Sequence, residues 1–220
     1  MRAAIRDACV TANNTPHNLS GQGMRSGRFF TFFALGLFLY FGYCISPYAH
    51  AEIVTLNGIK TEVYFSPYGG AEQAIVRAID KAQRDIRVLA YSFTSQPIED
   101  ALVRAAKRNV SVKIILDKSQ RNGKSSRLQS LIDSGMPVLI DKSHAIAHNK
   151  VIIIDRKRVI TGSFNFTAAA EKRNAENLLI LHSRNLAREY LKDFQEHLEH
   201  AQKVEGKSGT NRVNTSPHAR

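Results

Sequence analysis

Residues 148–165 read HNKVIIIDRKRVITGSFN and constrain the fold more than any other stretch of this chain. Residues 151–154 are four β-branched residues in a row, which favour extended backbone and predict a buried strand. Side chains two residues apart on a strand point the same way, so His148 and Lys150 should share one face. A second short strand at 159–161 would lead back toward them. The stretch therefore predicts a strand pair that gathers polar side chains at one end.

These polar side chains suit a phosphate group. After His148 and Lys150, the turn Gly162-Ser163 would return Asn165 to the same place. An imidazole can act as a nucleophile or proton shuttle, an ammonium supplies a point charge, and a carboxamide supplies a neutral donor. We expect Gly162 to form a tight turn, and Ser163 to hydrogen-bond there or to a phosphate rather than act as a nucleophile. The set predicts a site for a phosphate ester.

The spacing resembles the signature motif of the phospholipase D superfamily. One residue separates His from Lys, four separate Lys from Asp155, and six separate Asp155 from Gly-Ser-x-Asn. Other segments resemble the small bacterial single-motif nucleases of this superfamily, and the similarity covers roughly residues 53–200; these segments are 90–98, 112–117 and 174–177. The resemblance implies a phospholipase D-like α-β-α sandwich.

The chain around the motif alternates strands with amphipathic helices. We expect strands at 62–66, 86–93, 112–116, 138–140, 151–154, 159–161 and 177–182. We expect helices at 71–84, 97–108, 126–134, 167–172 and 186–202. This alternation predicts an α/β fold with a central mixed, mostly parallel sheet and some antiparallel pairing near the motif.

Residues 1–51 are expected to lie outside the fold. A basic segment at 24–28 precedes an apolar run at 29–45, and Ala49-His50-Ala51 has the pattern of a cleavage site. We predict a secretory signal peptide cleaved near Ala51, with either Met1 or Met24 as the true start, and hence a periplasmic or secreted protein without a stable membrane anchor. A retained anchor is the alternative, since the apolar run approaches the shortest membrane span.

Residues 52–202 are expected to form one nuclease domain, and the polar residues 203–220 a disordered tail. Both cysteines, Cys9 and Cys44, precede the domain, so it would hold no disulfide and no cysteine-based metal site. Residues 1–51 hold four of the 31 basic residues and one of the 19 acidic ones, so the net charge falls only from +12 to +9 without them. The basic domain points to a polyanionic partner.

A single motif copy predicts a homodimer. When His148 attacks a phosphodiester, the leaving oxygen lies opposite the attacking nitrogen, so a second acid is needed. A two-fold axis would bring His148 of a second chain to one composite site, and the family resemblance implies the same arrangement. One His148 would form a phosphohistidine, and the other would protonate the leaving group and then activate water.

The remaining motif residues are expected to support this reaction. Two copies of Lys150 and of Asn165 would hold the non-bridging oxygens. Glu176 is expected to accept a hydrogen bond from one ring nitrogen of His148 and so fix its tautomer, and the family carries a Glu in a matching context. Asp155 sits at odd spacing from His148, so we expect a structural role for it.

Metal binding is not expected. His144 and His148 form a His-x3-His pair, but residues 141–147 have a weak helical pattern, and no cysteine or carboxylate was found to complete a ligand set. A two-metal nuclease would need several converging carboxylates. The sequence therefore predicts an enzyme with no cofactor and no metal ion.

Two substrate classes fit this chemistry. Residues 118–127 follow a strand and carry four basic residues and no acidic one, namely Lys118, Arg121, Lys124 and Arg127. Such a loop suits tracking of a phosphate backbone. We expect a low-specificity endonuclease acting on DNA, with RNA as a further candidate. The alternatives are a phospholipase D acting on an anionic lipid such as cardiolipin, for which the sequence shows no apolar lip, and a catalytically silent nucleic-acid-binding protein.

Overall fold

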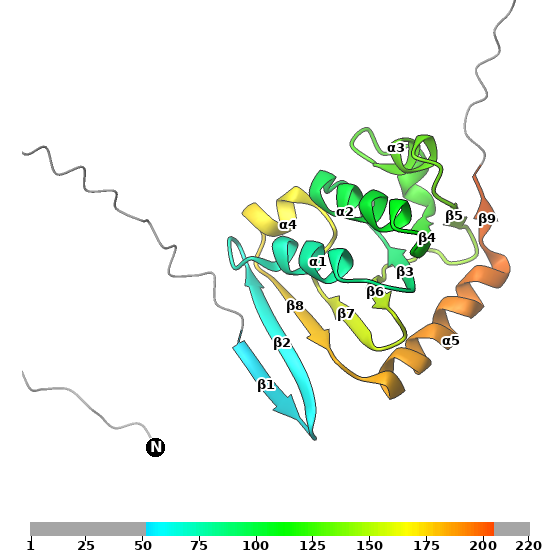
Figure 1. Ribbon diagram of the computed structural model, residues 1–220. Helices are drawn as coiled ribbons and strands as arrows, with labels where there is room; N and C mark the ends of the chain where they lie inside the picture. The colour runs from blue at the N-terminus through cyan, green and yellow to red at the C-terminus, as the bar shows by residue number, and fades with distance from the viewer. Residues whose placement is uncertain (1–51, 205–220) are drawn as a thin grey trace, which may run out of the picture. The chain divides into compact units, whose positions relative to one another are not determined.

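The computed structural model describes residues 52–204, which form a nine-stranded sheet with helices on both faces (Figure 1). The strand order is β1-β2-β8-β7-β6-β3-β4-β5-β9. The strands are β1 (Glu52–Leu56), β2 (Ile59–Ser66), β3 (Asp85–Ala90), β4 (Ser111–Asp117), β5 (Val138–Asp141), β6 (Lys150–Ile154), β7 (Arg158–Gly162), β8 (Glu176–Leu181) and β9 (Gln202–Lys203). The helices are α1 (Ala71–Asp80), α2 (Gln96–Lys107), the 3-10 helix η1 (Lys118–Arg121), α3 (Leu128–Asp133), α4 (Ala168–Lys172) and α5 (Arg184–His200).

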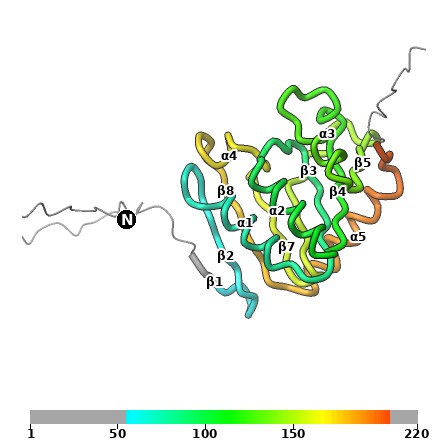
Figure 2. The backbone as a smooth tube through the Cα atoms, turned by 45° about the horizontal axis from the view of Figure 1, so that its top comes forward, coloured from blue at the N-terminus to red at the C-terminus, as the bar shows by residue number. Residues whose placement is uncertain are grey.

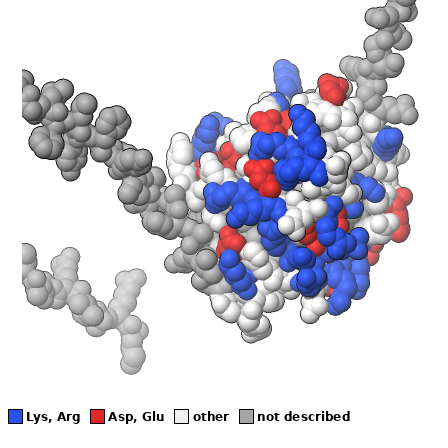
Figure 3. Space-filling model, viewed as in Figure 1, with Lys and Arg blue, Asp and Glu red and all other residues white. Residues whose placement is uncertain are grey.

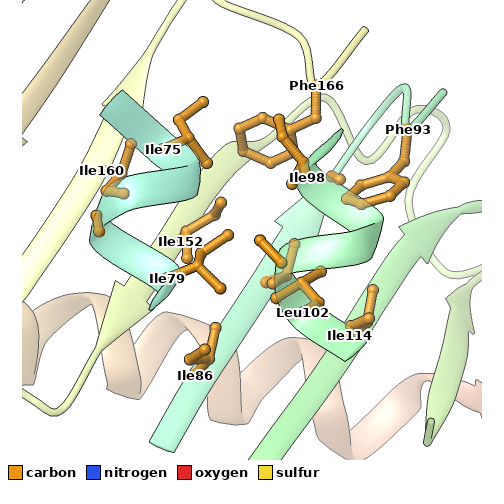
Figure 4. Packing of buried hydrophobic residues seen from close by; sticks show 14 of the residues in the cluster. Ile75, Ile79, Ile86, Phe93, Ile98, Leu102, Ile114, Ile152, Ile160 and Phe166 are labelled. Atoms are coloured by element: carbon orange, nitrogen blue, oxygen red, sulfur yellow. The ribbon is translucent and has the colours of Figure 1, made fainter. Parts of the chain in front are cut away.

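Two apolar clusters lie on opposite faces of this sheet. Helices α1 and α2 lie side by side over one face, while α5 crosses the other (Figures 1 and 2). Figure 4 shows Ile75 and Ile79 of α1 beside Ile98 and Leu102 of α2, packed on residues of the strands. On the opposite face, Phe194 and its neighbours on α5 pack on a second buried cluster. The expected α-β-α sandwich is confirmed.

The apolar run in β6 follows from this layering. Ile152 and Ile154 belong to the cluster under α1 and α2, whereas Val151 and Ile153 belong to the cluster under α5. A strand covered on both faces has no solvent side, so it reads as a continuous apolar run rather than as an alternating one. The prediction of a buried strand at 151–154 is confirmed.

The expectation of a mostly parallel sheet is wrong. Of the eight strand pairings in residues 52–204, only β3 with β4 and β4 with β5 are parallel. Strands β6 and β7 are joined by only three residues, and a connection this short can only reverse the chain. The sheet is therefore mixed, with an antiparallel half that contains the motif.

The pairing register brings the motif to one edge of the sheet. Lys150, which begins β6, lies opposite Ala90, which ends β3. Glu176, which begins β8, lies opposite Ser66, which ends β2. Gly162 ends β7 beside the start of β8. We call this the motif edge, formed by the last residues of β2, β3, β4, β5 and β7 and the first residues of β6 and β8.

Several elements differ from the sequence expectation: α1 ends at Asp80 rather than at residue 84, β3 ends at Ala90 rather than at residue 93, and β2 begins at Ile59 rather than at residue 62. Strand β1 was not anticipated, and Lys203, expected in the tail, pairs with Leu139 as part of β9. No helix within residues 52–204 is long and apolar enough to cross a membrane. The expected signal peptide and nearly all of the expected tail lie outside the described residues.

Candidate active site

His148 and Lys150 meet at the motif edge. The His148 side chain is exposed at the end of the loop before β6, and Lys150 is buried at 8% exposure. The ammonium of Lys150 lies 3.2 Å from Nδ1 of His148 and donates to the His148 carbonyl oxygen at 2.8 Å. The structure thus brings together the first two residues that were expected to be catalytic, His148 and Lys150.

Tyr91 completes this pair and was not anticipated. It directly follows β3, and its backbone N–H donates to the Asn149 carbonyl at 2.8 Å. Its ring lies 4.5 Å from the His148 ring, and the Lys150 ammonium lies 5.1 Å from the Tyr91 ring centre. An aromatic face attracts a cation and limits where the imidazole can turn. The sequence signal was only its place in the family-like segment 90–98.

Two opposing effects act on the pKa of Lys150. Burial lowers the pKa of Lys150 because removal from water disfavours the ammonium, whereas the nearby carboxylate of Glu176 raises it. This electrostatic coupling places Glu176 at the same site as Lys150. Burial has the larger effect, so the pKa of Lys150 is lowered and its ammonium is easier to deprotonate than that of an ordinary lysine.

Glu176 is held by its neighbours. Its two carboxylate oxygens accept from Ser163 Oγ at 2.6 Å and from Asn174 Nδ2 at 3.1 Å, and its backbone N–H donates to Ser66 Oγ. Ser163 Oγ also accepts from the Asn177 backbone N–H at 3.0 Å. Among the hydrogen bonds found within residues 52–204, none joins Glu176 to His148. The orienting role of Glu176 therefore stays a prediction, whereas Ser163 positions its carboxylate.

Gly162 is required by a close approach of two strands. Its φ is 149°, and a Cβ at this position would lie 2.3 Å from the Asn177 carbonyl oxygen. No side chain fits in that space without separating β7 from β8. The glycine therefore allows Ser163 to reach Glu176, and its role is a strand contact rather than the expected tight turn.

Asn165 has an amide that the surrounding chain does not fix. Its Oδ1 is buried and has no hydrogen-bond partner among residues 52–204. The next residue, Phe166, forms a parallel bridge with Phe93, which ties this segment to the one that carries Tyr91. An unpaired buried acceptor costs free energy, so such groups in proteins mark sites where a partner is missing.

Asp155 lies at the opposite edge of the sheet. Its carboxylate is 5% exposed and accepts from the backbone N–H groups of Gln83, Arg84 and Asp85, with Arg158 at 3.6 Å. The length of β6 separates it from Lys150, about 16 Å at the usual rise per residue. Asp155 thus holds the turn into β3, in keeping with the structural role that its spacing indicates.

The basic loop lies beside the motif edge, after β4. Its Gln120 side chain accepts from the Phe93 backbone, two residues after Tyr91. Lys118, Arg121 and Lys124 are exposed, although Lys118 donates to the His144 carbonyl at 3.0 Å. Arg127 differs, because its guanidinium pairs with the buried carboxylate of Glu99. Three of the four expected nucleic-acid-binding residues are therefore accessible, and Arg127 is committed to an internal ion pair.

His144 does not pair with His148. It contacts Asp141 instead, together with His197 and His200 of α5. Burial alone would raise the pKa of Asp141, but hydrogen bonds from His144 and His197 hold it well below its usual range. The sequence signals were the spacings Asp-x-x-His and His-x-x-His, whose meeting in space depends on the sheet.

The comparison with protein families decides the relationship. The model of the family described as cardiolipin synthase, PLD-like domain, matches residues 75–198. This chain belongs to the phospholipase D superfamily. The resemblance expected from the motif is confirmed, and the chain is a phosphodiesterase of that superfamily.

Individual phospholipase D relatives agree with this assignment. A protein named phospholipase D from Rickettsia felis is 48% identical over 145 residues, which are 66% of this chain and 72% of that protein. A mitochondrial cardiolipin hydrolase from Xenopus laevis is 32% identical over 114 residues, or 52% of this chain and 54% of that one. Nuc from Salmonella typhimurium, a phospholipase D family member, has a TM-score of 0.65 and 39% identity, covering 67% of this chain and 99% of its own.

Proposed function

We propose that this phosphodiesterase is a low-specificity endonuclease that hydrolyses DNA at a composite site formed by two copies of the chain. One observation carries the proposal: an exposed imidazole lies 3.2 Å from a buried ammonium, beside a loop with three accessible basic residues. An extended polyanion can follow the loop while one phosphodiester reaches His148. The resemblance to small bacterial single-motif nucleases supports the same substrate.

The tautomer of His148 would change when a phosphate enters. The Lys150 ammonium can only donate, so Nδ1 of a neutral His148 accepts and the ring proton resides on Nε2. A bound phosphate would draw Lys150 to its oxygens and release Nδ1. If Nδ1 then carries the proton and donates to Glu176, Nε2 is left bare for attack on phosphorus. Ser163 and Asn174 would hold the Glu176 carboxylate ready for this step.

Two histidines would share the reaction. Nε2 of one His148 bonds to phosphorus while the bond from phosphorus to the leaving oxygen breaks, which gives a phosphohistidine. The protonated His148 of the second chain donates its proton to that oxygen. It then takes a proton from water, whose oxygen attacks phosphorus and releases the first histidine. Lys150 and Asn165 from both chains would hold the non-bridging oxygens.

The residues at the motif edge favour catalysis without a metal ion at the reacting phosphate. A two-metal nuclease needs several converging carboxylates. Here the two oxygens of Glu176 are engaged by Ser163 and Asn174, and those of Asp117 accept from the backbone N–H groups of Ser119 and Ala147. Lys150 would therefore supply the positive charge that a metal supplies in other nucleases.

A second candidate substrate is an anionic phospholipid. Phe65, Tyr68 and Ile146 are exposed large apolar side chains, at 63%, 61% and 59%. Phe65 and Tyr68 flank the end of β2 at the motif edge, and Ile146 lies two residues before His148. These residues come from separate segments, so an apolar lip was not expected from the sequence. The relatives named phospholipase D and cardiolipin hydrolase support this candidate.

One experiment distinguishes the two substrates with two variants, each of which carries three substitutions. Residues 52–220 would be assayed on plasmid DNA, on single-stranded RNA and on cardiolipin vesicles. We expect Lys118→Gln, Arg121→Gln and Lys124→Gln together to lower DNA affinity at least tenfold and to reduce its salt dependence, because three phosphate contacts are lost. We expect Phe65→Ser, Tyr68→Ser and Ile146→Ser together to leave DNA cleavage nearly unchanged.

The matched control removes the same charge from the opposite edge of the sheet. Lys81, Lys107 and Lys157 are exposed there, and their change to Gln should leave DNA binding within about twofold. Figure 3 shows why this control is needed, since Lys and Arg side chains also gather over the face covered by α1 and α2. Equal losses in the two basic variants would place the DNA elsewhere. If the wild type hydrolyses cardiolipin vesicles but leaves DNA intact, and the Phe65→Ser, Tyr68→Ser, Ile146→Ser variant loses vesicle hydrolysis, the substrate is the lipid.

We also propose export to the periplasm or the medium, with cleavage near Ala51. The support is the order of basic, apolar and Ala-x-Ala segments before the domain. Sequencing the N-terminus of protein recovered from each cell fraction tests it. A mature chain beginning at Glu52 outside the cytoplasm is expected, and an intact apolar segment in the membrane fraction would contradict it.

A further inference from the structure

We propose that Asp141, His144, His197 and His200 form a binding site for one divalent transition-metal ion, with zinc as the best fit. One ligand atom from each of these residues lies within 4.8 Å of the others. Asp141 ends β5, His144 lies in the following loop, and the two remaining histidines occupy the last turn of α5. Three imidazoles and one carboxylate form a ligand set that zinc binds with tetrahedral geometry.

The three rings already converge on one point. His144 Nδ1, His197 Nδ1 and His200 Nε2 lie 2.8, 2.7 and 3.3 Å from the same oxygen, Oδ2 of Asp141. The ring centres are 4.8 to 5.6 Å apart. Ligand atoms around tetrahedral zinc, with bonds of about 2.0–2.1 Å, lie about 3.3 Å apart. Small side-chain rotations would therefore turn the cluster into a coordination sphere.

A purely hydrogen-bonded cluster explains this arrangement less well. A carboxylate oxygen offers two lone pairs, whereas three ring nitrogens approach Oδ2. A metal ion at the centre would instead give each nitrogen and the oxygen one bond. Asp141 is fully buried and His197 is 7% exposed, while His144 and His200 keep side-chain exposures of 49% and 32%. An ion could thus enter from solvent.

Neighbouring groups are placed to orient the ligands. The other oxygen of Asp141, Oδ1, accepts from the backbone N–H groups of Ser143 and His144 at 2.9 and 3.3 Å. Asp193 Oδ1 lies 4.0 Å from Nε2 of His197, the ring nitrogen that faces away from the cluster. Metal-binding histidines commonly donate this second N–H to a carboxylate, which leaves the first nitrogen bare for the metal. At 4.0 Å Asp193 does not yet accept this hydrogen bond, and a small side-chain rotation would bring it within reach.

A bound metal ion would stabilise the loop that carries His148. Residues 142–149 connect β5 to β6 and carry both His144 and His148. A metal ion would bind this loop to the end of α5, next to the β5–β9 pairing. Strands β5 and β6 are three positions apart in the sheet, or about 14 Å at the usual strand spacing. The ion would therefore stabilise the loop and take no part in the reaction at phosphorus.

Metal binding is measured directly on untagged residues 52–220, since a histidine tag would itself bind the ions. The chelator-stripped protein is titrated with Co²⁺, followed by competition with Zn²⁺. We expect one equivalent of Co²⁺ with the visible absorption of a tetrahedral site, its loss on adding one equivalent of Zn²⁺, and a Tm raised by roughly 5 °C or more. These readouts need no substrate, so they are independent of the proposed nuclease activity.

Three variants make the test specific. His144→Gln and His200→Gln, which change partly exposed residues, should each lower Co²⁺ affinity at least tenfold without unfolding the apo protein. His182→Gln, whose ring contacts Glu62 instead, should bind as the wild type does. The proposal is overturned if the wild type takes up no stoichiometric metal. It is equally overturned if His144→Gln and His200→Gln both bind as tightly as His182→Gln.

Discussion

At the scale of single residues, the neighbours of Lys150 determine how the proposed site works. Lys150 is the buried positive charge beside an exposed imidazole, and Glu176 offsets the effect of its burial. In the proposed mechanism the ammonium holds the phosphate, so the activity should fall as rising pH removes its proton. Because the pKa of Lys150 is lowered, this fall should begin below the ordinary lysine value of 10.5.

Glu176→Gln should move that fall to still lower pH. Removing the carboxylate removes the charge that raises the pKa of Lys150, and only the lowering effect of burial remains. The measurement is kcat/KM on a DNA substrate from pH 7 to 10.5. Glu189→Gln, on the exposed side of α5, is the control and should leave the profile unchanged. An alkaline limb that stays in place or moves upward in Glu176→Gln would contradict the coupling.

Asp155→Asn should lower stability rather than alter the chemistry. Asn tolerates the positive φ of 54° at this position but removes the charge that accepts from three backbone N–H groups. We expect a loss of about 2 kcal/mol in the free energy of unfolding, measured by urea denaturation. Asp133→Asn, at an exposed position, should stay within about 0.5 kcal/mol. Equal stability of both variants would remove the structural role of Asp155.

At the scale of elements, the approach of β7 to β8 controls the position of Ser163. Gly162→Ala would drive a methyl group into the Asn177 carbonyl, so the strands must separate. Gly58→Ala is the matched control, because Gly58 also has a positive φ but nothing lies within 4 Å of its added Cβ. Both variants also carry backbone strain of about 1–3 kcal/mol from the positive φ.

We expect Gly162→Ala to lose about 2 kcal/mol more than Gly58→Ala and to lose most of its activity. The activity loss follows because displaced strands would break the bond from Ser163 to Glu176. Thermal unfolding and DNA cleavage are measured on both variants. A Gly162→Ala protein as stable and as active as the control would show that the close approach of β7 to β8 does not require glycine.

The elements also show what the sequence could and could not predict. Amphipathic patterns were sufficient for the long helices, and the run of four β-branched residues was sufficient for the buried strand β6, whose residues face two cores. Strand β1 was missed although Asn57-Gly58 is a strong hairpin signal, and both residues have positive φ. The three-residue connection between β6 and β7 already excluded a parallel pair. Strand β9 has only two residues and depends on β5, so no local pattern could reveal it.

At the scale of the whole molecule, the motif predicted that His148 and Lys150 lie together, but only the assembled sheet shows their surroundings. Tyr91 reaches His148 because β3 lies beside β6. The histidines of α5 meet Asp141 because the helix crosses the sheet to its β5 edge. Such contacts join residues more than 50 positions apart, so local sequence spacing could not predict them.

The central claim is that His148 carries out metal-independent phosphodiester cleavage of DNA. It is tested most directly by plasmid nicking with residues 52–220 in excess EDTA, beside His148→Ala. His148 is exposed, so the variant should fold as the wild type does, which circular dichroism checks. We expect nicking by the wild type and at least a thousandfold loss in the variant, about the effect of removing a catalytic nucleophile. Equal nicking by both proteins, or intact DNA in both reactions, would contradict the account.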